Sequence, residues 1–308
     1  MSPNLNPSSI KRNPGRLGRM PSIFTDTKTG RVLAGNKRKL HETPFFLQTN
    51  PPNNAVTVGA SVTTDPQIMR ISSEGPLEVA EMGIKRSNTC TVVLYLNDGN
   101  TPIRMMNSPC HIDTIFGTGG LMFPMPEALY LDENRSLSIA YTDLSGAGAT
   151  VRAALSAAKY SQLQQDANLA RIKQRLDSGQ YLSMPFFYTF DQGSVALTAL
   201  QTSQLEIQID PAYHFEIHQI SFVSTGSFSI NIVDEAKGES IINAPSNTNF
   251  PIPHLLLCGN ASHPYRYSEP ILCFAQQKLQ VTLQDTSGAA NTIFLTLSGK
   301  AITTKKWS

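Results

Sequence analysis

One sequence pattern occurs twice in this chain. A run of the form Asp-x-Ser-Gly-Ala stands at Asp143–Ala147 and again at Asp285–Ala289, 142 residues later. The same offset relates Gly117 to Gly259. Self-similarity at a fixed spacing means that a chain builds one structural unit more than once. The pattern therefore predicts two copies of one fold, and any proposed architecture has to accommodate both.

The limits of the copies follow from matching segments. Pro44–Phe46 matches Pro185–Phe187 and marks where each copy begins. With 308 residues, the chain is long enough for two domains that each bury a core. We therefore expect the following division: an arm at 1–40, a first repeat at 44–156, a linker at 157–184, a second repeat at 185–303 and a tail at 304–308.

Each copy has the pattern of a β protein. The segment 227–232 alternates apolar and polar residues, and 91–96 is a short run rich in β-branched and apolar residues. Further alternating segments occur at 136–141 and 278–283, each followed by turn residues. Short strands spaced by about ten residues are typical of antiparallel sandwiches. The predicted fold class is all-β, with two tandem antiparallel β-sandwiches of the jelly-roll type.

The Asp-x-Ser-Gly runs have a structural explanation. Asp143 and Asp285 are suited to accept hydrogen bonds from the backbone of their own turns. Gly146 and Gly288 are suited to a positive φ, which other residues adopt only with strain. We predict that these four residues are structural turn residues and not a site of chemistry.

Between the copies the periodicity changes to that of a helix. Leu169, Ile172 and Leu176 form an apolar stripe, with Gly179 where a C-terminal cap belongs. The predicted helix spans about 160–178 and connects the two sandwiches. It either covers a neighbouring sheet or docks on another subunit.

The first forty residues form a basic arm. They hold nine cations and one acid, Asp26, so the arm carries 9 − 1 = +8 and the other residues 16 − 22 = −6. Its prolines and glycines and its few large apolar residues predict an extended segment that contacts a partner. Acidic protein surfaces, other copies included, are favoured over nucleic acid, because Phe24 alone could stack on bases. The predicted partner-binding cations are Lys11, Arg12, Arg16, Arg19, Lys28, Arg31, Lys37, Arg38 and Lys39.

Composition excludes several classes of protein. No apolar run approaches the length of a membrane span, so we expect no membrane contact. Residues 1–40 contain no apolar core of a signal peptide, and the four cysteines are too scattered for a disulfide framework. We expect reduced thiols in a chain made in a cytoplasm.

Candidate sites for chemistry have poor patterns. His254, Cys258, His263 and Cys273 are residue types that bind zinc, but their spacing fits no compact metal site, and Leu255–Cys258 has the pattern of a buried strand. His111 and Asp113 lack an accompanying nucleophile motif. His214 and His218 are expected on the polar side of a strand. We predict no catalytic residue, no metal and no cofactor.

The chain also resembles a known group of proteins. The run Phe123-Pro-Met-Pro-Glu127, then Leu137–Ala147 and Thr150-Val-Arg152, is similar to a β-rich domain of virion structural proteins in tailed bacteriophages. Glu269-Pro270 and Asp285–Thr292 carry the same pattern. The resemblance covers most of 44–303 and implies a role in the virus particle without chemistry of its own.

The resulting prediction is a non-enzymatic virion protein of the minor capsid, decoration, collar or tail-adaptor type. It would bridge neighbouring virion proteins, such as capsid, portal, collar or tail components and copies of itself, through its sandwiches and an ordered arm. Two alternatives stay open. One is a host-receptor or carbohydrate-binding module, for which Tyr265 and Tyr267 are the exposed-looking aromatic pair. The other is a double jelly-roll major capsid protein.

Overall fold

The computed structural model describes most of the two predicted repeats. The described residues are 43–48, 55–69, 77–98, 101–118, 121–131, 135–159, 182–242, 251–257 and 259–303. The predicted basic arm at 1–40, the predicted helix at 160–178 and the tail at 304–308 lie outside these residues.

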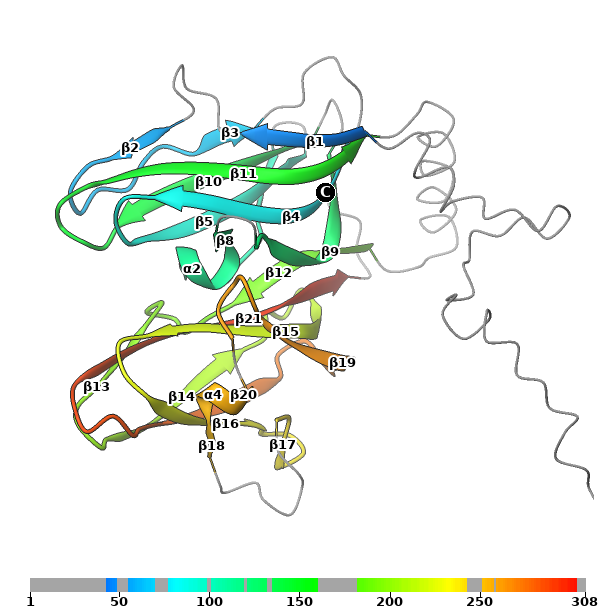
Figure 1. Cartoon of the computed structure of the whole chain (residues 1–308). Coiled ribbons are helices and arrows are strands. Elements are labelled where there is room, and N and C mark those ends of the chain that lie inside the picture. Colours follow the sequence, from blue (N-terminus) through cyan, green and yellow to red (C-terminus); the bar gives the residue numbers. More distant parts are fainter. Residues whose placement is uncertain are drawn as a thin grey trace, which may run out of the picture. The chain divides into compact units, whose positions relative to one another are not determined.

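The first sandwich is formed by strands β1 to β11 (Figure 1). One sheet has the order β1-β11-β4, with β2 paired to β11 and with β8 and β9 paired to β4. Its strands are β1 (Thr43–Gln48), β2 (Val56–Val58), β4 (Leu77–Arg86), β8 (Gly117–Thr118), β9 (Phe123–Leu131) and β11 (Ala149–Lys159). The other sheet has the order β3-β10-β5-β6, with β7 paired to β5. Its strands are β3 (Gln67–Met69), β5 (Cys90–Asp98), β6 (Thr101–Arg104), β7 (Cys110–His111) and β10 (Arg135–Asp143), and the one-turn helix α2 (Ile112–Ile115) follows β7.

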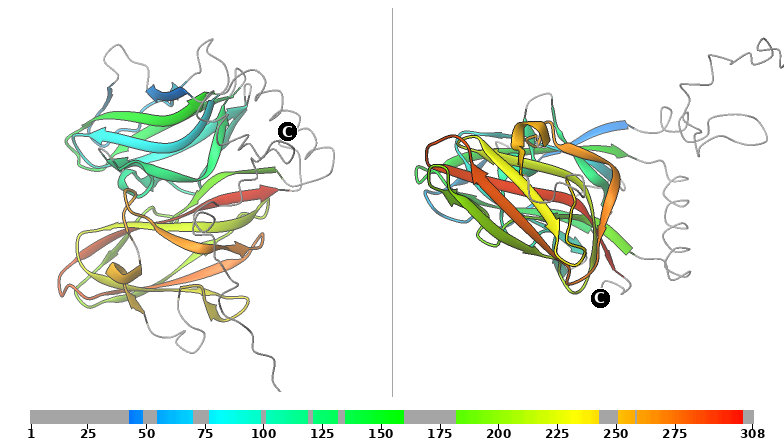
Figure 2. Two further views of the ribbon diagram at one scale, coloured as in Figure 1. Left: turned by 45° about the vertical axis from the view of Figure 1, so that its right-hand side comes forward. Right: turned by 90° about the horizontal axis from the view of Figure 1, so that it is seen from below.

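The second sandwich repeats this plan with strands β12 to β21 (Figure 2). One sheet has the order β12-β21-β15-β19, with β13 paired to β21. Its strands are β12 (Leu182–Tyr188), β13 (Val195–Leu197), β15 (His214–Ser224), β19 (Tyr265–Cys273) and β21 (Asn291–Thr303). The other sheet has the order β14-β20-β16-β17, with β18 paired to β16. Its strands are β14 (Thr202–Gln208), β16 (Phe228–Asp234), β17 (Glu239–Ser240), β18 (Ile252–Pro253) and β20 (Lys278–Asp285), and the one-turn helix α4 (His254–Leu257) follows β18.

The two sandwiches correspond strand by strand, so the predicted fold class is confirmed. Even local irregularities correspond: β4 has a bulge between Val79 and Glu81, and β15 has one between Ile217 and Gln219. Among the described residues, the pairing within each sandwich is antiparallel apart from one short contact. There, Gly117 pairs in parallel with Gly83, and Gly259 forms a parallel bridge with Ser221. Met106 forms a parallel bridge with Phe187 between the sandwiches.

Alternation explains which side of each strand is buried. In β11, Val151, Ala153 and Leu155 point into the core, whereas Thr150 and Arg152 are exposed. The prolines of β9 and β19 are tolerated because each of these strands pairs with one neighbour only, so a missing backbone donor leaves no gap in a ladder. The segments predicted as strands at 91–96, 136–141 and 278–283 lie within β5, β10 and β20, and 227–232 overlaps β16 in all but its first residue.

One local prediction is wrong. Leu255–Cys258 was expected to form a buried strand, but His254–Leu257 form helix α4, and Leu255 and Leu256 are 76% and 77% exposed. A run of four apolar residues has no period that separates a strand from a helical turn, and here the chain bends immediately after the two-residue strand β18. Among the described residues, no helix is long and apolar enough to cross a bilayer.

Candidate functional site

The turn at Asp143 is held by its carboxylate. The backbone N–H groups of Ser61, Ser145 and Gly148 donate to this side chain at 3.1–3.2 Å, and the Ser145 hydroxyl donates at 2.6 Å. These bonds, that from the Ser145 hydroxyl above all, lower the pKa of Asp143 to about 2. Gly146 has a φ of 70°. The carboxylate of Asp143 therefore stabilises its own turn through these hydrogen bonds.

The turn at Asp285 has the same construction. Its carboxylate accepts from the N–H groups of Leu200, Ser287 and Gly288 at 2.9–3.2 Å and from the Ser287 hydroxyl at 2.6 Å. The hydroxyl bond is the largest cause of the lowered pKa of Asp285. Gly288 has a φ of 73°. Neither turn offers a free carboxylate for catalysis.

The most elaborate polar site lies where the two sandwiches meet, and we call it the seam. The described residues from 44 onward belong to one compact unit, so both sandwiches and the contacts across the seam lie within it. Asn107 bonds Thr189 twice: its Nδ2 donates to the Thr189 carbonyl and its Oδ1 accepts from the Thr189 N–H, both at 2.8 Å. Backbone bonds join Met105, Asn107 and Phe187 beside it. The Asn107 side-chain amide therefore bonds the backbone of Thr189 as a neighbouring strand would, and it links the first sandwich to the second.

A second part of the seam surrounds helix α2. The Thr114 hydroxyl lies 2.7 Å from the Thr296 hydroxyl, and the Ser221 hydroxyl donates to the Thr114 carbonyl. Thr114, Ser221 and Thr296 are all at most 1% exposed. Further along, Gln219 donates to the Pro124 carbonyl at 3.0 Å. Buried polar groups with partners make a junction specific, because sliding would leave them unpaired.

Apolar contacts complete the seam. Phe187 from β12 and Ala261 belong to the buried core of the first sandwich, and Phe187 lies 6.2 Å from Phe123 between ring centroids. Ile103 packs against the cores of both sandwiches. The two sandwiches therefore share part of one core, and the described contacts join them along the seam.

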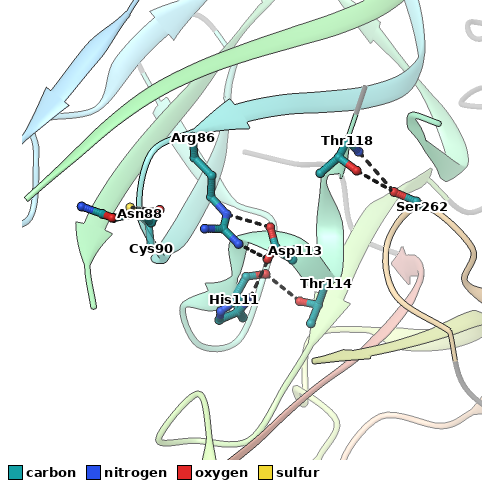
Figure 3. Close-up of polar contacts among 8 residues, drawn as sticks. All are labelled: Arg86, Asn88, Cys90, His111, Asp113, Thr114, Thr118 and Ser262. Carbon is teal, nitrogen blue, oxygen red and sulfur yellow. Dashed lines mark hydrogen bonds and ion pairs between the residues drawn. The ribbon is translucent and has the colours of Figure 1, made fainter. Parts of the chain in front are cut away.

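Charged groups at the seam are arranged around α2 (Figure 3). Arg86 from β4 reaches Asp113 with two side-chain hydrogen bonds, Nε donating to Oδ1 at 2.9 Å. This bond is the main reason for the raised pKa of Arg86. His111 caps α2 by accepting from the Asp113 N–H at 3.2 Å, and its ring lies 4.3 Å from that of Phe294.

His111 is neutral in this position. The side chain is buried, and burial lowers its pKa from 6.5 to about 4, against the opposing effect of Asp113. A neutral Nδ1 is what the helix cap needs, since a protonated ring has no acceptor. His111 and Asp113 therefore hold α2 in place and are not arranged as a catalytic pair.

An open pocket of about 370 Å³ lies beside this cluster. Both sandwiches line it, and the Thr118 N–H donates to the Ser262 hydroxyl at 3.2 Å at its edge. Its lining residues are Asp113, Phe116, Thr118, Phe222, Val223, Ser224, Asn260 and Ser262. Asp113 is its one charged lining residue and is already paired with Arg86, so the pocket presents no free acid or base.

The stability of the protein should depend on pH through His111. Because the folded state disfavours the charged ring, the unfolded state binds more protons between pH 6.5 and 4, and stability falls with acidification. The two pKa values correspond to a loss of about 3 kcal/mol of unfolding free energy over that window. Denaturant titrations at several pH values measure it. His111→Asn keeps a capping side chain without a titrating group, so an equally steep pH dependence in that variant would contradict the assignment.

The residues considered for a metal are not brought together. His254 is buried, with Nδ1 2.7 Å from the Phe228 carbonyl oxygen and its ring stacked on Phe228. His263 is exposed, Cys273 is buried, and Cys258 lies outside the described residues. Across the described part of the chain, no three His, Cys, Asp or Glu residues are placed to hold a metal ion.

The other histidines and cysteines also have structural surroundings. His214 and His218 are half-buried on β15, where His214 accepts from the Ala275 N–H at 3.1 Å and His218 lies 3.4 Å from Glu216. The described cysteines, Cys90, Cys110 and Cys273, are buried free thiols. Burial raises the pKa of Cys110 and of Cys273 to about 12.

The nine cations predicted to bind a partner all lie outside the described residues. The seam, in contrast, was not predicted. Its side chains are single Thr, Ser, Asn and Gln residues that form no motif in the sequence. A comparison of the two repeats could have signalled it, since Thr296 and Ser221 stand where the first repeat has Ala154 and Gly83.

No protein-family model and no curated protein matches the sequence. Among solved structures, the chain is similar to the major capsid protein P2 of bacteriophage PM2, with 9% identity and a TM-score of 0.38 over 83% of this chain and 97% of that one. The STIV MCP is 8% identical, with a TM-score of 0.35 over 83% and 96%. PBCV-1 VP54, fitted into a reconstruction of the virophage Sputnik, is 8% identical, with a TM-score of 0.37 over 85% and 94%. These likenesses are low by both measures, and the fold assignment rests on the strand order.

Proposed function

We propose that this chain is a structural subunit of a virus particle, made in the host cytoplasm and without an enzymatic activity of its own. The observation that carries the proposal is the seam: two jelly-roll-like sandwiches are joined by buried and partly buried hydrogen bonds and share part of one core. A repeating shell requires subunits whose parts keep one relative orientation, and contacts such as those of the seam favour a single orientation.

The chemistry of the described residues supports a structural role. Asp143 and Asp285 are used by their own turns, Asp113 is paired with Arg86, and His111 caps a helix. The sequence resemblance to virion domains of tailed bacteriophages points in the same direction and extends the proposal to a phage particle.

Two placements in the particle compete. A minor capsid, decoration, collar or adaptor protein would be present in few copies, and a double jelly-roll major capsid protein in many. The seam favours the second, since both sandwiches are fixed in one orientation and can be repeated as a unit. The copy number relative to the other proteins of purified particles, measured by quantitative mass spectrometry, decides between them.

The basic arm belongs to this proposal as a contact with neighbouring subunits. Its +8 charge complements the −6 of the remaining chain, which would guide the encounter. Ordering about forty residues costs on the order of 1 kcal/mol each, so extensive burial against a partner has to offset it.

Assembly of the purified full chain tests the function. We expect ordered particles or sheets by negative-stain electron microscopy, and a chain beginning at His41 should fold but assemble weakly. A full chain that stays monomeric at every concentration would contradict the proposal. A truncated chain that assembles normally would contradict the role of the arm alone.

A receptor- or carbohydrate-binding module is the second candidate because of one aromatic pair. Tyr265 and Tyr267 lie 5.3 Å apart on β19 with perpendicular rings, and Tyr265 is 38% exposed. Binding to a glycan array that is lost in Tyr265→Ala would favour this candidate.

A further inference from the structure

The one-turn helices occupy equivalent places but have opposite surroundings. Helix α2 follows β7 and α4 follows β18, and Gly117 and Gly259 form their parallel contacts after them. The constant offset places Leu256 where the first sandwich has Thr114. Thr114 is fully buried in the seam, whereas Leu256 is 77% exposed. The end of the second sandwich that corresponds to a docked surface is therefore uncovered among the described residues.

The surface that receives α2 also has an equivalent. Thr114 contacts Ser221 and Thr296, which are partners in the register of β15 and β21. The matching register pair of β4 and β11 in the first sandwich is Gly83 and Ala154. Ala154 points outward and is half-buried, while the equivalent Thr296 is 1% exposed.

The contact within the chain is polar on both sides, whereas the two corresponding uncovered surfaces are both apolar. Within the chain, the Thr114 hydroxyl meets the Thr296 hydroxyl, and the Thr114 carbonyl accepts from the Ser221 hydroxyl. In the uncovered pair, Leu255 and Leu256 would meet a glycine and an alanine, and the Met122 side chain lies against Gly83, its Cε 2.9 Å from where a Cβ would stand. Methionine adapts to a docked surface, and the two small residues leave room for branched side chains.

We propose that Leu255 and Leu256 of one copy dock on the Gly83, Ala154 and Met122 surface of a second copy, repeating between chains the contact that α2 makes within the chain. This inference rests on the proposed function and names the partner surface. Because the contact inside the chain is polar and the contact between chains is apolar, neither helix suits the surface that receives the other. Leu256 placed on this surface would leave the buried Thr296 hydroxyl without the hydroxyl partner that Thr114 provides.

The contact joins two different surfaces and is therefore heterologous. Each copy offers one leucine pair and one receiving surface, so association continues until a ring closes or a filament forms. A pairing of two identical surfaces would stop at two copies. This difference makes the geometry testable with variants.

The experiment uses the full chain and sedimentation velocity over a concentration series. Leu255→Ser/Leu256→Ser should weaken self-association about a hundredfold or more, because two leucine side chains are no longer buried. Ala154→Glu, which blocks the receiving surface, should have a similar effect. Mixed together, the two variants still have one intact pair of surfaces and should form a complex of one copy of each and nothing larger.

Leu144→Ser is the matched control, since Leu144 is an exposed leucine outside both surfaces, and it should associate like the wild type. Thermal unfolding of every variant shows that it is folded. Wild-type association in the leucine variant would overturn the docking surface while leaving the particle function standing. Normal association of Ala154→Glu would overturn the receiving surface, and a wild type without any association would count against both proposals.

Discussion

Gly117→Ala and Gly259→Ala should each lower the free energy of unfolding by about 3 kcal/mol or more, because a side chain there overlaps backbone atoms. At Gly117 a Cβ would overlap the Leu121 carbonyl oxygen and stand 2.5 Å from the Phe123 nitrogen. At Gly259 it would overlap the His263 carbonyl oxygen and stand 2.7 Å from its carbon. Backbone atoms at the turn cannot move aside as a flexible side chain could. Chemical denaturation of the two variants measures the loss.

Gly146→Ala provides the comparison for this experiment. Gly146 has a positive φ but nothing within 4 Å of its missing Cβ, so the cost is conformational alone, about 1–2 kcal/mol. Equal losses in all three variants would show that close approach is not what excludes a side chain at Gly117 and Gly259.

Asn107→Ala should produce the second large effect, a loss of about 2–4 kcal/mol together with a change in the shape of unfolding. The substitution leaves the N–H and the carbonyl of Thr189, which is 1% exposed, without their partners. Since these bonds cross the seam, the two sandwiches should begin to unfold separately. Differential scanning calorimetry would then show two transitions where the wild type shows one.

Asn97→Ala is the control for a polar contact within one sandwich, where Asn97 bonds Ser136 at 3.0 Å and also Ser138. It should lower stability without separating the transitions. A single transition in Asn107→Ala would mean that the seam does not depend on this bond for its coupling.

The sequence predicted the parts of the fold that repeat or alternate. Alternation located β10, β16 and β20, and the offset between repeats paired Asp143 with Asp285, each of which accepts from the N–H and the hydroxyl of the serine two residues on. Helix α4 could not be predicted because three consecutive leucines have no period. The exposure of α4 depends on which other segments of the chain cover it, and the residues of α4 alone carry no information about that.

The seam was not predicted for a different reason. Thr114, Thr296 and Asn107 are of residue types that normally face solvent. Thr114 and Thr296 are buried, and Asn107 is half-buried, where one sandwich covers the other. The informative signal was a difference between the repeats and not their similarity: positions that carry hydroxyl groups in one copy carry glycine, alanine or leucine in the other.

The shared core has a consequence for how the protein is made. Phe187 and Ala261 complete the core of the first sandwich but lie far beyond its last strand, which ends at Lys159. A ribosome adding about 5–20 residues per second needs on the order of 10 s to pass from there to Ala261. During that time the first sandwich has emerged with part of its interior open to water. The order of synthesis therefore delays the final closure of the N-terminal half until the C-terminal half exists, which leaves a window in which chaperones can bind the nascent chain.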